Sequence, residues 1–401
     1  MNKLRTIASV ITFSLFASLS PAPQKGICIV PVADLLSQKV IPQAGQSVLD
    51  CYQAIPLSEN PPLKLCTRVT QLLYNQEVTI LGKEKGQLYI ETPYWHLKKP
   101  TSSCPSSKND RFWTLASNIK PLSALTQEEQ TTIPDPVRSH SKRPTIILKN
   151  PFECPQTGLT YSVGTRFVIT QEDDAAYTVS LYDLTEKEMV TCNIPASLCI
   201  KEVPLSPKEK RTLFVKMIRE WAHPHNGFIP YVLGGTSIGK LPADDRFIEK
   251  KVGNFFLPSI IHKRPTYTDY PYNGVDCIGL IRLASLVSGT PLYATNSTSL
   301  SSILQKLPAG SLPENGDLVY WKGHMAIISD VDKGLLIEAR GYNHGYGIVQ
   351  EIPYQEQFHL IHTTDDLVKA SHKHSLLGRF DKRGIKRETV HNLTIYKLPI
   401  E

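Results

Sequence analysis

Apolar residues recur every three to four positions between residues 207 and 221, which is the spacing of a helix with one buried face. Ser206 and Glu209 form a capping box ahead of this segment, and Pro207 suits the first helical position. Pro224 ends the pattern. The sequence therefore predicts a helix that begins a third folded region of the chain.

A second helical pattern starts at Cys277 and runs through Val287, with Gly289 as a normal helix end. The Cys277 sulfur then lies in the first turn, where free backbone N–H groups and the helix dipole favour negative charge. Such a position lowers a thiol pKa and makes a thiolate nucleophile available near neutral pH. A buried, inert cysteine is the alternative.

The chain ahead of the first helix has a different pattern, of short β-prone runs broken by Pro, Gly and Asn. Residues 72–81 and 87–91 predict two strands joined by a turn, and residues 160–169 and 176–182 repeat that arrangement. Small β-barrels are the natural way to bury such strands. We therefore expect two barrels in the first half of the chain.

The predicted fold class is α+β, with two small β-barrels followed by a mixed domain. The barrels occupy residues 29–122 and 145–203, and residues 123–144 between them, rich in Ser, Thr, Gln and Pro, predict a linker. The mixed domain spans residues 206–362. Residues 363–401 are basic, and we expect them to form a solvated, partly flexible tail.

Three strands are expected after the second helix. Residues 313–322 predict a turn and a strand, residues 323–329 a second strand and residues 335–340 a third. Residues 392–398 are a possible further strand.

The turn between the second and third strands sets their register. If residues 330–334 form this turn, His324 lies opposite Arg340. Glu338 is then a diagonal neighbour of His324 on the same face of the sheet, within reach of a long side chain.

Composition narrows the class of partner. With 401 residues, 41% hydrophobic and 20% charged, the chain has the composition of an ordinary globular protein of two to three domains. The net charge of +7 favours anionic partners, such as a cell-wall polymer or an acidic membrane surface. This charge is too mild to imply nucleic acid, and we expect no nucleic-acid partner.

The N-terminus has the pattern of a secretory signal. Residues 1–5 are basic, and residues 6–19 form an apolar run that is short for a membrane span. We expect a signal peptide over residues 1–22, with a retained anchor as the alternative, and no stable membrane insertion after cleavage. The protein is then exported to the periplasm or cell envelope.

Cysteine usage is uneven, because Cys277 is the only cysteine after residue 203. In an exported protein the seven earlier cysteines are disulfide candidates, and an odd number leaves at least one free or paired between molecules. None has the Cys-x-x-Cys spacing of a zinc site, and we expect neither a metal nor a cofactor. The seven are Cys28, Cys51, Cys66, Cys104, Cys154, Cys192 and Cys199.

Cys277, His324 and Glu338 together fit the roles of nucleophile, base and orienting group. Cys277 would attack an acyl carbon, and His324 would take the thiol proton and later protonate the leaving amine. Glu338 would hold the imidazole tautomer. The backbone N–H of Cys277 can supply one oxyanion donor. Each residue alone has an ordinary structural role, so the prediction depends on the combination.

Four short motifs resemble those of the NlpC-type papain-like cysteine peptidases, which cut bacterial cell-wall peptides. The resemblance covers residues 206–362. With two SH3-like modules ahead of it, the arrangement resembles the γ-D-glutamyl-L-diamino-acid endopeptidases. The motifs are Tyr231-Val-Leu-Gly-Gly235, Asp276-Cys-Ile-Gly-Leu280, Gly316-Asp-Leu318 and Gly323-His324.

The resemblance implies a role for each site residue. Cys277 is the implied nucleophile, His324 the base and Glu338 the third polar group. The Tyr231 hydroxyl would assist the oxyanion or the substrate carbonyl, and Asp276 would help to hold the free amine of the L-Ala end of a stem peptide. A core aromatic and a plain helix N-cap are the alternative roles of these last two residues.

The sequence also departs from the family pattern. Ile278 replaces the usual Ser, Leu233 the usual Trp, and Glu338 the usual His, Asn or Gln. The charge of Glu338 favours imidazolium and hence a thiolate–imidazolium pair. His344 is an alternative orienting group.

Two further segments differ from the family. Asn296 and Ser297 lie where the family has a polar pair that binds the amine, with Asn in place of an acid. The insertion at residues 236–275 is much longer than usual.

The expected function is that of an exported cysteine endopeptidase. It would hydrolyse the γ-D-Glu–diamino-acid bond of peptidoglycan stem peptides, in cell-wall remodelling or recycling. An N-acetylmuramoyl-L-alanine amidase or an acyltransferase of the same fold is an alternative. A non-catalytic wall-binding protein is another, and a disulfide-linked envelope structural protein is a third.

Overall fold

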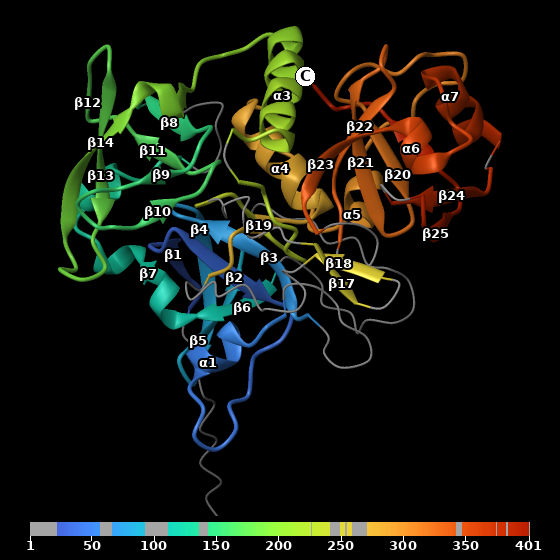
Figure 1. Cartoon of the computed structure of the whole chain (residues 1–401). Helices are drawn as coiled ribbons and strands as arrows, with labels where there is room; N and C mark the ends of the chain where they lie inside the picture. The colour runs from blue at the N-terminus through green and yellow to red at the C-terminus, as the bar shows by residue number, and fades with distance from the viewer. Residues whose placement is uncertain are drawn as a thin grey trace, which may run out of the picture.

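The protein, in a computed structural model, consists of three regions that contact one another (Figure 1). Strands build the first two regions, and helices with a five-stranded sheet build the third. The structure describes residues 22–56, 66–92, 111–135, 143–225, 227–240, 249–252, 255–258, 271–341, 347–373, 375–381 and 384–400. The predicted signal peptide lies almost wholly outside these residues, as do Cys104 and His344.

The first region is an antiparallel sheet of seven strands: β1 (Gln24–Cys28), β2 (Val32–Leu36), β3 (Arg68–Leu73), β4 (Glu77–Glu84), β5 (Gln87–Glu91), β6 (Arg111–Leu115) and β7 (Ile119–Pro121), with helix α1 (Val48–Gln53). The strand order is β3-β2-β6-β5-β4-β1-β7. The edge strands β3 and β7 do not pair among the described residues, so the expected closed barrel is not formed. β3 faces the third region instead, where the Thr236 N–H donates to the Gln71 side chain at 2.9 Å.

The predicted strand at 72–81 is broken by a turn. Asn75 there has a φ of +67°, a left-handed conformation that Asn tolerates better than most residues, and β4 begins two residues later. β4 then extends to Glu84 and turns through Lys85 and Gly86 into β5. The predicted strand, turn and strand are therefore present, with the first break in a different place.

The second region consists of small sheets: β8 (Thr145–Leu148) with β11 (Arg166–Val168) and β15 (Cys199–Lys201), β12 (Gln171–Glu172) with β13 (Ala176–Tyr182) and β14 (Met189–Pro195), and β9 (Phe152–Glu153) with β10 (Thr160–Tyr161). These sheets also form no closed barrel among the described residues. The predicted strand at 176–182 is confirmed. The one at 160–169 is interrupted at Gly164, whose φ is +84°. Part of the predicted linker is helical, because α2 (Gln127–Thr131) begins at a capping box of Thr126 and Glu129.

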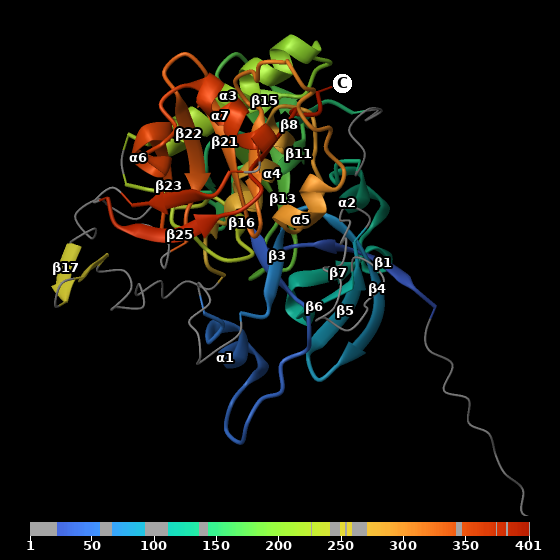
Figure 2. The same cartoon turned by 90° about the vertical axis from the view of Figure 1, so that its right-hand side faces the viewer.

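The third region has two central helices and one antiparallel sheet. Helix α3 (Pro207–Ala222) carries the predicted Ser206–Glu209 capping box, and α4 (Cys277–Val287) begins at Cys277 as predicted. The sheet consists of β20 (Leu318–Trp321), β21 (His324–Asp330), β22 (Leu335–Ala339), β23 (Val349–Pro353) and β26 (Thr394–Tyr396), in the order β23-β22-β21-β20-β26. The two helices lie between this sheet and the second region (Figure 1), while the first region lies below both (Figure 2).

The register of β21 and β22 agrees with the sequence prediction. Ile327 pairs with Ile337 and Ile328 with Leu336, and continuing this register places His324 opposite Arg340. The pairing changes only near the turn, where Asp330 pairs with Leu335 and a bulge falls between.

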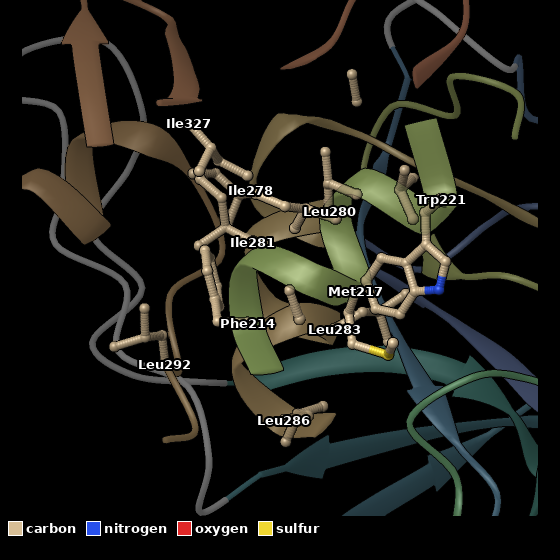
Figure 3. Packing of buried hydrophobic residues seen from close by; sticks show 14 of the residues in the cluster. Phe214, Met217, Trp221, Ile278, Leu280, Ile281, Leu283, Leu286, Leu292 and Ile327 are labelled. Atoms are coloured by element: carbon tan, nitrogen blue, oxygen red, sulfur yellow. The ribbon is translucent and has the colours of Figure 1, made fainter. Parts of the chain in front are cut away.

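The helices and the sheet share one apolar core (Figure 3). Phe214 and Met217 of α3 pack with Ile278 and Ile281 of α4 and with Ile327 of β21, and all five are 3% exposed or less. Burial of an apolar side chain of this size contributes roughly 1.5–3 kcal/mol. The core therefore fixes the start of α4 against the strand that carries His324.

The remaining short elements of the third region connect these parts. They are β16 (Thr236–Ser237) with β19 (Gly274–Val275), β17 (Glu249–Val252) with β18 (Phe255–Pro258), α5 (Ser297–Ser301) and α6 (Tyr354–Phe358). Pro230 and Tyr231 form isolated bridges, with Ile348 and Val275 respectively.

The solvated tail predicted at residues 363–401 is wrong for the residues that the structure describes there. They form α7 (Thr364–Lys373), the hairpin of β24 (Leu377–Phe380) and β25 (Lys386–Val390), and β26. Leu367, Leu377 and Val390 are buried in a second apolar core behind the sheet, and β26 pairs with β20. The prediction followed the many basic residues of this segment. The apolar residues that form its core are widely spaced among them and gave no clear periodic pattern.

Six of the described cysteines are free thiols: Cys28, Cys51, Cys154, Cys192, Cys199 and Cys277. Among the disulfide candidates, Cys154 and Cys192 approach most closely among the contacts of the described residues, with their sulfurs 2.9 Å apart. None of the described helices is both long and apolar enough to cross a membrane.

Candidate active site

The loop before α4 places Cys277 in the first turn of the helix. Asp276 is the N-cap, and its Oδ1 accepts hydrogen bonds from the backbone N–H of Ile278 at 2.9 Å and of Gly279 at 2.7 Å. The other oxygen, Oδ2, accepts from the N–H of Gly234 at 3.0 Å. The carboxylate of Asp276 therefore joins two segments that are distant in the sequence.

Glycines allow these two segments to meet closely. A Cβ at Gly279 would lie 1.9 Å from the Gly235 carbonyl oxygen, so no other residue fits there without movement of the backbone. Gly234 has a φ of +69°, which favours glycine, and its Cβ would lie 2.8 Å from the Arg68 carbonyl oxygen of β3. The first β-rich region thus supports the loop behind the candidate nucleophile.

Both oxygens of Asp276 are used within the protein, as expected of a helix N-cap. Burial raises the pKa of Asp276 to about 6, although the N–H groups of Gly279, Gly234 and Ile278 act in the opposite direction. Its role toward a substrate amine stays a prediction.

The Cys277 thiol is nearly buried, at 9% exposure. Burial raises its pKa, and the charge of Asp276 adds to the rise. The backbone N–H groups of Met325 and Ile278 and the guanidinium of Arg379 lower the pKa, but they do not outweigh burial. The predicted lowering of this thiol pKa is therefore wrong, and the thiol needs a base to become a nucleophile.

The predicted base, His324, lies on the strand that contacts the thiol. The Met325 N–H that interacts with the thiol is in β21, next to His324 in the sequence. His324 Nε2 lies 2.8 Å from Glu338 Oε2, so the predicted contact between the two side chains is observed. Among the described residues, the hydrogen-bond partners of the imidazole are all at Nε2, which leaves Nδ1 to accept a proton.

Glu338 is buried among basic groups. Its Oε2 also accepts a hydrogen bond from Arg379 Nη2, and its Oε1 lies 3.7 Å from Arg340 Nη1. Burial alone would raise the pKa of Glu338, but the two guanidiniums and the hydrogen bond from His324 lower it well below the usual range. Glu338 is therefore an anion, which can only accept hydrogen bonds.

The anionic state of Glu338 fixes the tautomer of His324. Arg379 Nη2 lies 3.3 Å from His324 Nε2, but a guanidinium can only donate. The nearer Glu338 oxygen, at 2.8 Å, takes the Nε2 proton. Burial, followed by the charge of Arg379, lowers the pKa of His324, and Glu338 opposes the change. The resting imidazole is therefore neutral, with the lone pair on Nδ1.

The other predicted site residues are placed around α4. Tyr231 forms a bridge with Val275, just before Asp276, and its ring Cζ lies 3.5 Å from where a Cβ at Gly341 would be. Asn296 caps α5, and its Oδ1 accepts from the Ser299 N–H at 2.8 Å.

Ser297 is buried in the first turn of α5, which packs against α4. The amine-binding roles expected of Asn296 and Ser297 stay predictions.

Sequence reasoning missed Arg379 and Glu388 of the β24–β25 hairpin. Arg379 is 1% exposed, and its Nη1 lies 3.4 Å from Glu388 Oε2. Residues 386–390 are Lys-Arg-Glu-Thr-Val, which lack the alternation of apolar and polar side chains typical of a strand, so no signal in the sequence pointed to this hairpin. The predicted strand register placed Arg340 opposite His324, but no role in the site was predicted for it.

Comparisons with known proteins identify the fold. No protein-family model and no curated protein matches the chain. It is similar to the crystal structure of an NlpC/P60 family protein from Bacillus cereus, with a TM-score of 0.52, 14% identity, and coverage of 82% of this chain and 94% of that one. It also matches NlpC2 from Trichomonas vaginalis (TM-score 0.30, 11% identity, 83% and 93% coverage).

A further match is the peptidoglycan hydrolase RipB from Mycobacterium tuberculosis (TM-score 0.23, 20% identity, 38% and 66% coverage), but neither of these two weaker likenesses adds to the fold assignment. The similarity to the Bacillus cereus protein shows an NlpC/P60-type fold, which is a papain-like α+β domain preceded here by small antiparallel sheets.

Proposed function

We propose that this protein is a cysteine peptidase that acts on peptidoglycan stem peptides and cuts the γ-D-Glu–diamino-acid bond. The observation that carries the proposal is the hydrogen-bond contact between His324 Nε2 and Glu338 Oε2 at 2.8 Å, where His324 lies on the strand whose backbone N–H reaches the Cys277 thiol. This arrangement supplies a nucleophile, a base and an orienting anion in one NlpC/P60-type fold.

The first half of the reaction forms an acyl-enzyme. His324 Nδ1 takes the proton of the Cys277 thiol as the sulfur attacks the γ-carbonyl carbon of D-Glu. The carbonyl oxygen becomes an oxyanion, and the Cys277 backbone N–H, in the first turn of α4, can donate to it. His324 then gives its proton to the leaving amine, so the C–N bond breaks and a thioester remains.

Water completes the reaction. His324 Nδ1 takes a proton from the water, whose oxygen attacks the thioester carbon. The carbon–sulfur bond breaks, the Cys277 sulfur recovers the proton, and the γ-carboxylate of D-Glu is released. Glu338 keeps Nε2 protonated throughout, because an anion stabilises the imidazolium that forms in each half.

General-base attack fits the electrostatics better than a resting thiolate–imidazolium pair. Burial raises the pKa of Cys277 and lowers that of His324, so both groups are neutral at rest. The proton then moves from sulfur to Nδ1 only as the substrate is attacked.

Substrate choice rests on the family resemblance and on charge. The motifs around Tyr231 and Cys277 resemble those of enzymes that cut stem peptides, and the net charge of +7 suits an anionic wall polymer. We propose the amine of the L-Ala end as the group held near Asp276, Asn296 and Ser297. Export, and SH3-like modules at residues 29–122 and 145–203 that direct the enzyme to the wall, belong to the same proposal.

Product identification tests the bond and the substrate class. The protein is incubated with L-Ala-γ-D-Glu-diaminopimelate and, separately, with the same peptide attached to MurNAc, and the products are identified by mass. We expect the dipeptide L-Ala-γ-D-Glu and free diaminopimelate from the first substrate. Release of an intact stem peptide from MurNAc would show the amidase instead, and transfer of an acyl group from a lipid would show an acyltransferase.

One observation favours a non-catalytic alternative, namely the burial of Cys277 at 9% exposure. Alkylation distinguishes the two functions. If His324 acts as base, iodoacetamide should modify Cys277 faster in the wild type than in His324→Gln at the same pH, because the imidazole takes the thiol proton as the sulfur attacks. Equal, slow modification of both proteins would indicate an inert cysteine.

A further inference from the structure

The C-terminal hairpin of β24 and β25 contributes a side chain to the candidate active site. Arg379 of β24 is 1% exposed and donates through Nη2 to Glu338 Oε2, the same oxygen that accepts from His324. Its Nη1 lies 3.4 Å from Glu388 Oε2 of β25. Two carboxylates therefore contact the guanidinium, one at Nη2 and one at Nη1.

Other contacts fix the guanidinium plane. The Arg379 Cζ lies 4.9 Å from the centroid of the Trp321 ring, a cation–π arrangement, and the ring of Trp321 lies 4.8 Å from that of His324. Trp321 Nε1 donates to Glu388 Oε1 at 2.8 Å. Trp321 and Glu388 thus hold Arg379 in place beside the imidazole.

A second arginine holds the hairpin to the sheet. Arg340, the residue after β22, is also 1% exposed and donates from Nη2 to the Phe380 carbonyl at 2.8 Å. Its Nη1 faces Glu338. The strand that carries Glu338 and the strand that carries Arg379 are therefore fixed to each other by a buried contact.

We propose that Arg379 is a positioning residue that holds Glu338 against His324 Nε2, which makes the C-terminal hairpin a required part of the active site. The inference rests on the proposed function for its effect on catalysis. Arg379 does not touch the reacting atoms in this account. It acts through Glu338, and through its charge on the imidazole.

The charge of Arg379 has a predictable sign at His324. The charged groups that act on the imidazole are Glu338 of β22, Arg379 of β24 and Glu388 of β25. Arg340 lies next to Glu338, and α4, which packs against β21, begins at Asp276 and Cys277. After burial, Arg379 makes the largest contribution to the lowered pKa of His324, while Glu338 and Glu388 raise this pKa. Removal of the arginine charge should raise the pKa of His324, and removal of the Glu388 charge should lower it.

Two variants with opposite expected shifts test the proposal. Arg379→Met removes the charge at similar length, and Glu388→Gln removes the facing anion but keeps a similar shape. The pH profile of kcat/KM is measured for each, with Arg379→Lys as the variant that keeps the charge. Because the base must be neutral, the acid limb of this profile follows the pKa of His324.

We expect Arg379→Met to lower kcat/KM by roughly tenfold to a hundredfold and to move the acid limb to higher pH, whereas Arg379→Lys restores the position of the limb. Glu388→Gln should move the limb to lower pH. If Arg379 and Glu388 had only a structural role, all three variants would have a lower maximal kcat/KM, and the acid limb of the pH profile would not move. An unchanged limb in folded Arg379→Met and in Glu388→Gln would overturn the proposal.

A measurement that does not depend on activity separates this inference from the proposed function. The His324 imidazole is titrated by nitrogen NMR in the full-length protein and in each variant, which reports its pKa and tautomer. If the wild type cleaves no stem peptide but its His324 still titrates higher in Arg379→Met and lower in Glu388→Gln, the function is wrong and the positioning role holds. The same His324 titration in every variant would contradict the positioning role.

Discussion

At the scale of single residues, the carboxylate of Glu338 joins His324 to two buried cations. Glu338 Oε2 accepts from both His324 and Arg379, while Oε1 faces Arg340 at 3.7 Å. Removal of one member of such a network destabilises the protein by more than the net stabilisation from the ion pair, because the remaining charges stay buried without a partner. The acid in this site therefore has a structural as well as a chemical role.

Glu338→Gln tests the chemical role. The amide keeps the size of the side chain but removes the charge that raises the pKa of His324 and stabilises its imidazolium. We expect kcat to fall by roughly 10²–10⁴-fold and the acid limb of kcat/KM to move to lower pH, measured with the stem tripeptide. An acid limb that moves to higher pH would contradict the assigned electrostatics.

The sequence indicated part of this site but not all of it. The positions of His324 and Glu338 followed from strand alternation and a five-residue turn, which are local features, and the contact is present at 2.8 Å. The predicted shift in the pKa of Cys277 had the wrong direction. Burial, which the sequence does not show, raises the pKa more than the helix N-terminus lowers it. Arg379 was missed because its place depends on how a distant hairpin packs.

At the scale of elements, the start of α4 depends on a contact without side chains. Gly279 lies against the Gly235 carbonyl, and Asp276 holds the two segments together through three N–H groups. The capping residue and the helix ends were predictable because they follow local rules. Whether the sheets close into barrels could not be predicted, because an edge strand can either pair within its own sheet or face another region.

Gly279→Ala tests this contact, because helix propensity and tertiary packing should change the free energy of unfolding in opposite directions. Helix propensity alone would stabilise α4 by about 1 kcal/mol. The new Cβ would lie 1.9 Å from a backbone oxygen, so we expect a net loss on the order of 3 kcal/mol in the free energy of unfolding, measured with denaturant. Gly82→Ala, where nothing lies within 4 Å of the new Cβ, is the control and should change little. A stabilised Gly279→Ala protein would mean that the two segments are not in contact.

At the scale of the whole molecule, the first β-rich region and the third region share a buried polar contact. Gln71 of β3 donates from Nε2 to Asp34 Oδ1 and to the Tyr272 carbonyl, and its Oε1 accepts from Thr236 and Ser237, at 2.8–2.9 Å. All four groups are satisfied by one side chain. The loop that leads to Cys277 is therefore built partly by the first region.

Gln71→Leu should show this coupling. The variant keeps the volume but leaves buried donors and acceptors without partners, each at a cost of about 1–3 kcal/mol. We expect a lower free energy of unfolding together with lower activity, since the loop behind Cys277 loses its support. Gln171→Leu, at an exposed position of β12, is the matched control. If Gln71→Leu unfolds like the control, the two regions are not coupled through this side chain.

The central claim is that Cys277 is the nucleophile for hydrolysis of the stem peptide. The most direct measurement is the rate of release of diaminopimelate from L-Ala-γ-D-Glu-diaminopimelate, followed by mass, for the wild type and for Cys277→Ala. We expect L-Ala-γ-D-Glu and free diaminopimelate from the wild type and no product above the uncatalysed rate from Cys277→Ala. Cleavage by Cys277→Ala as fast as by the wild type would contradict it.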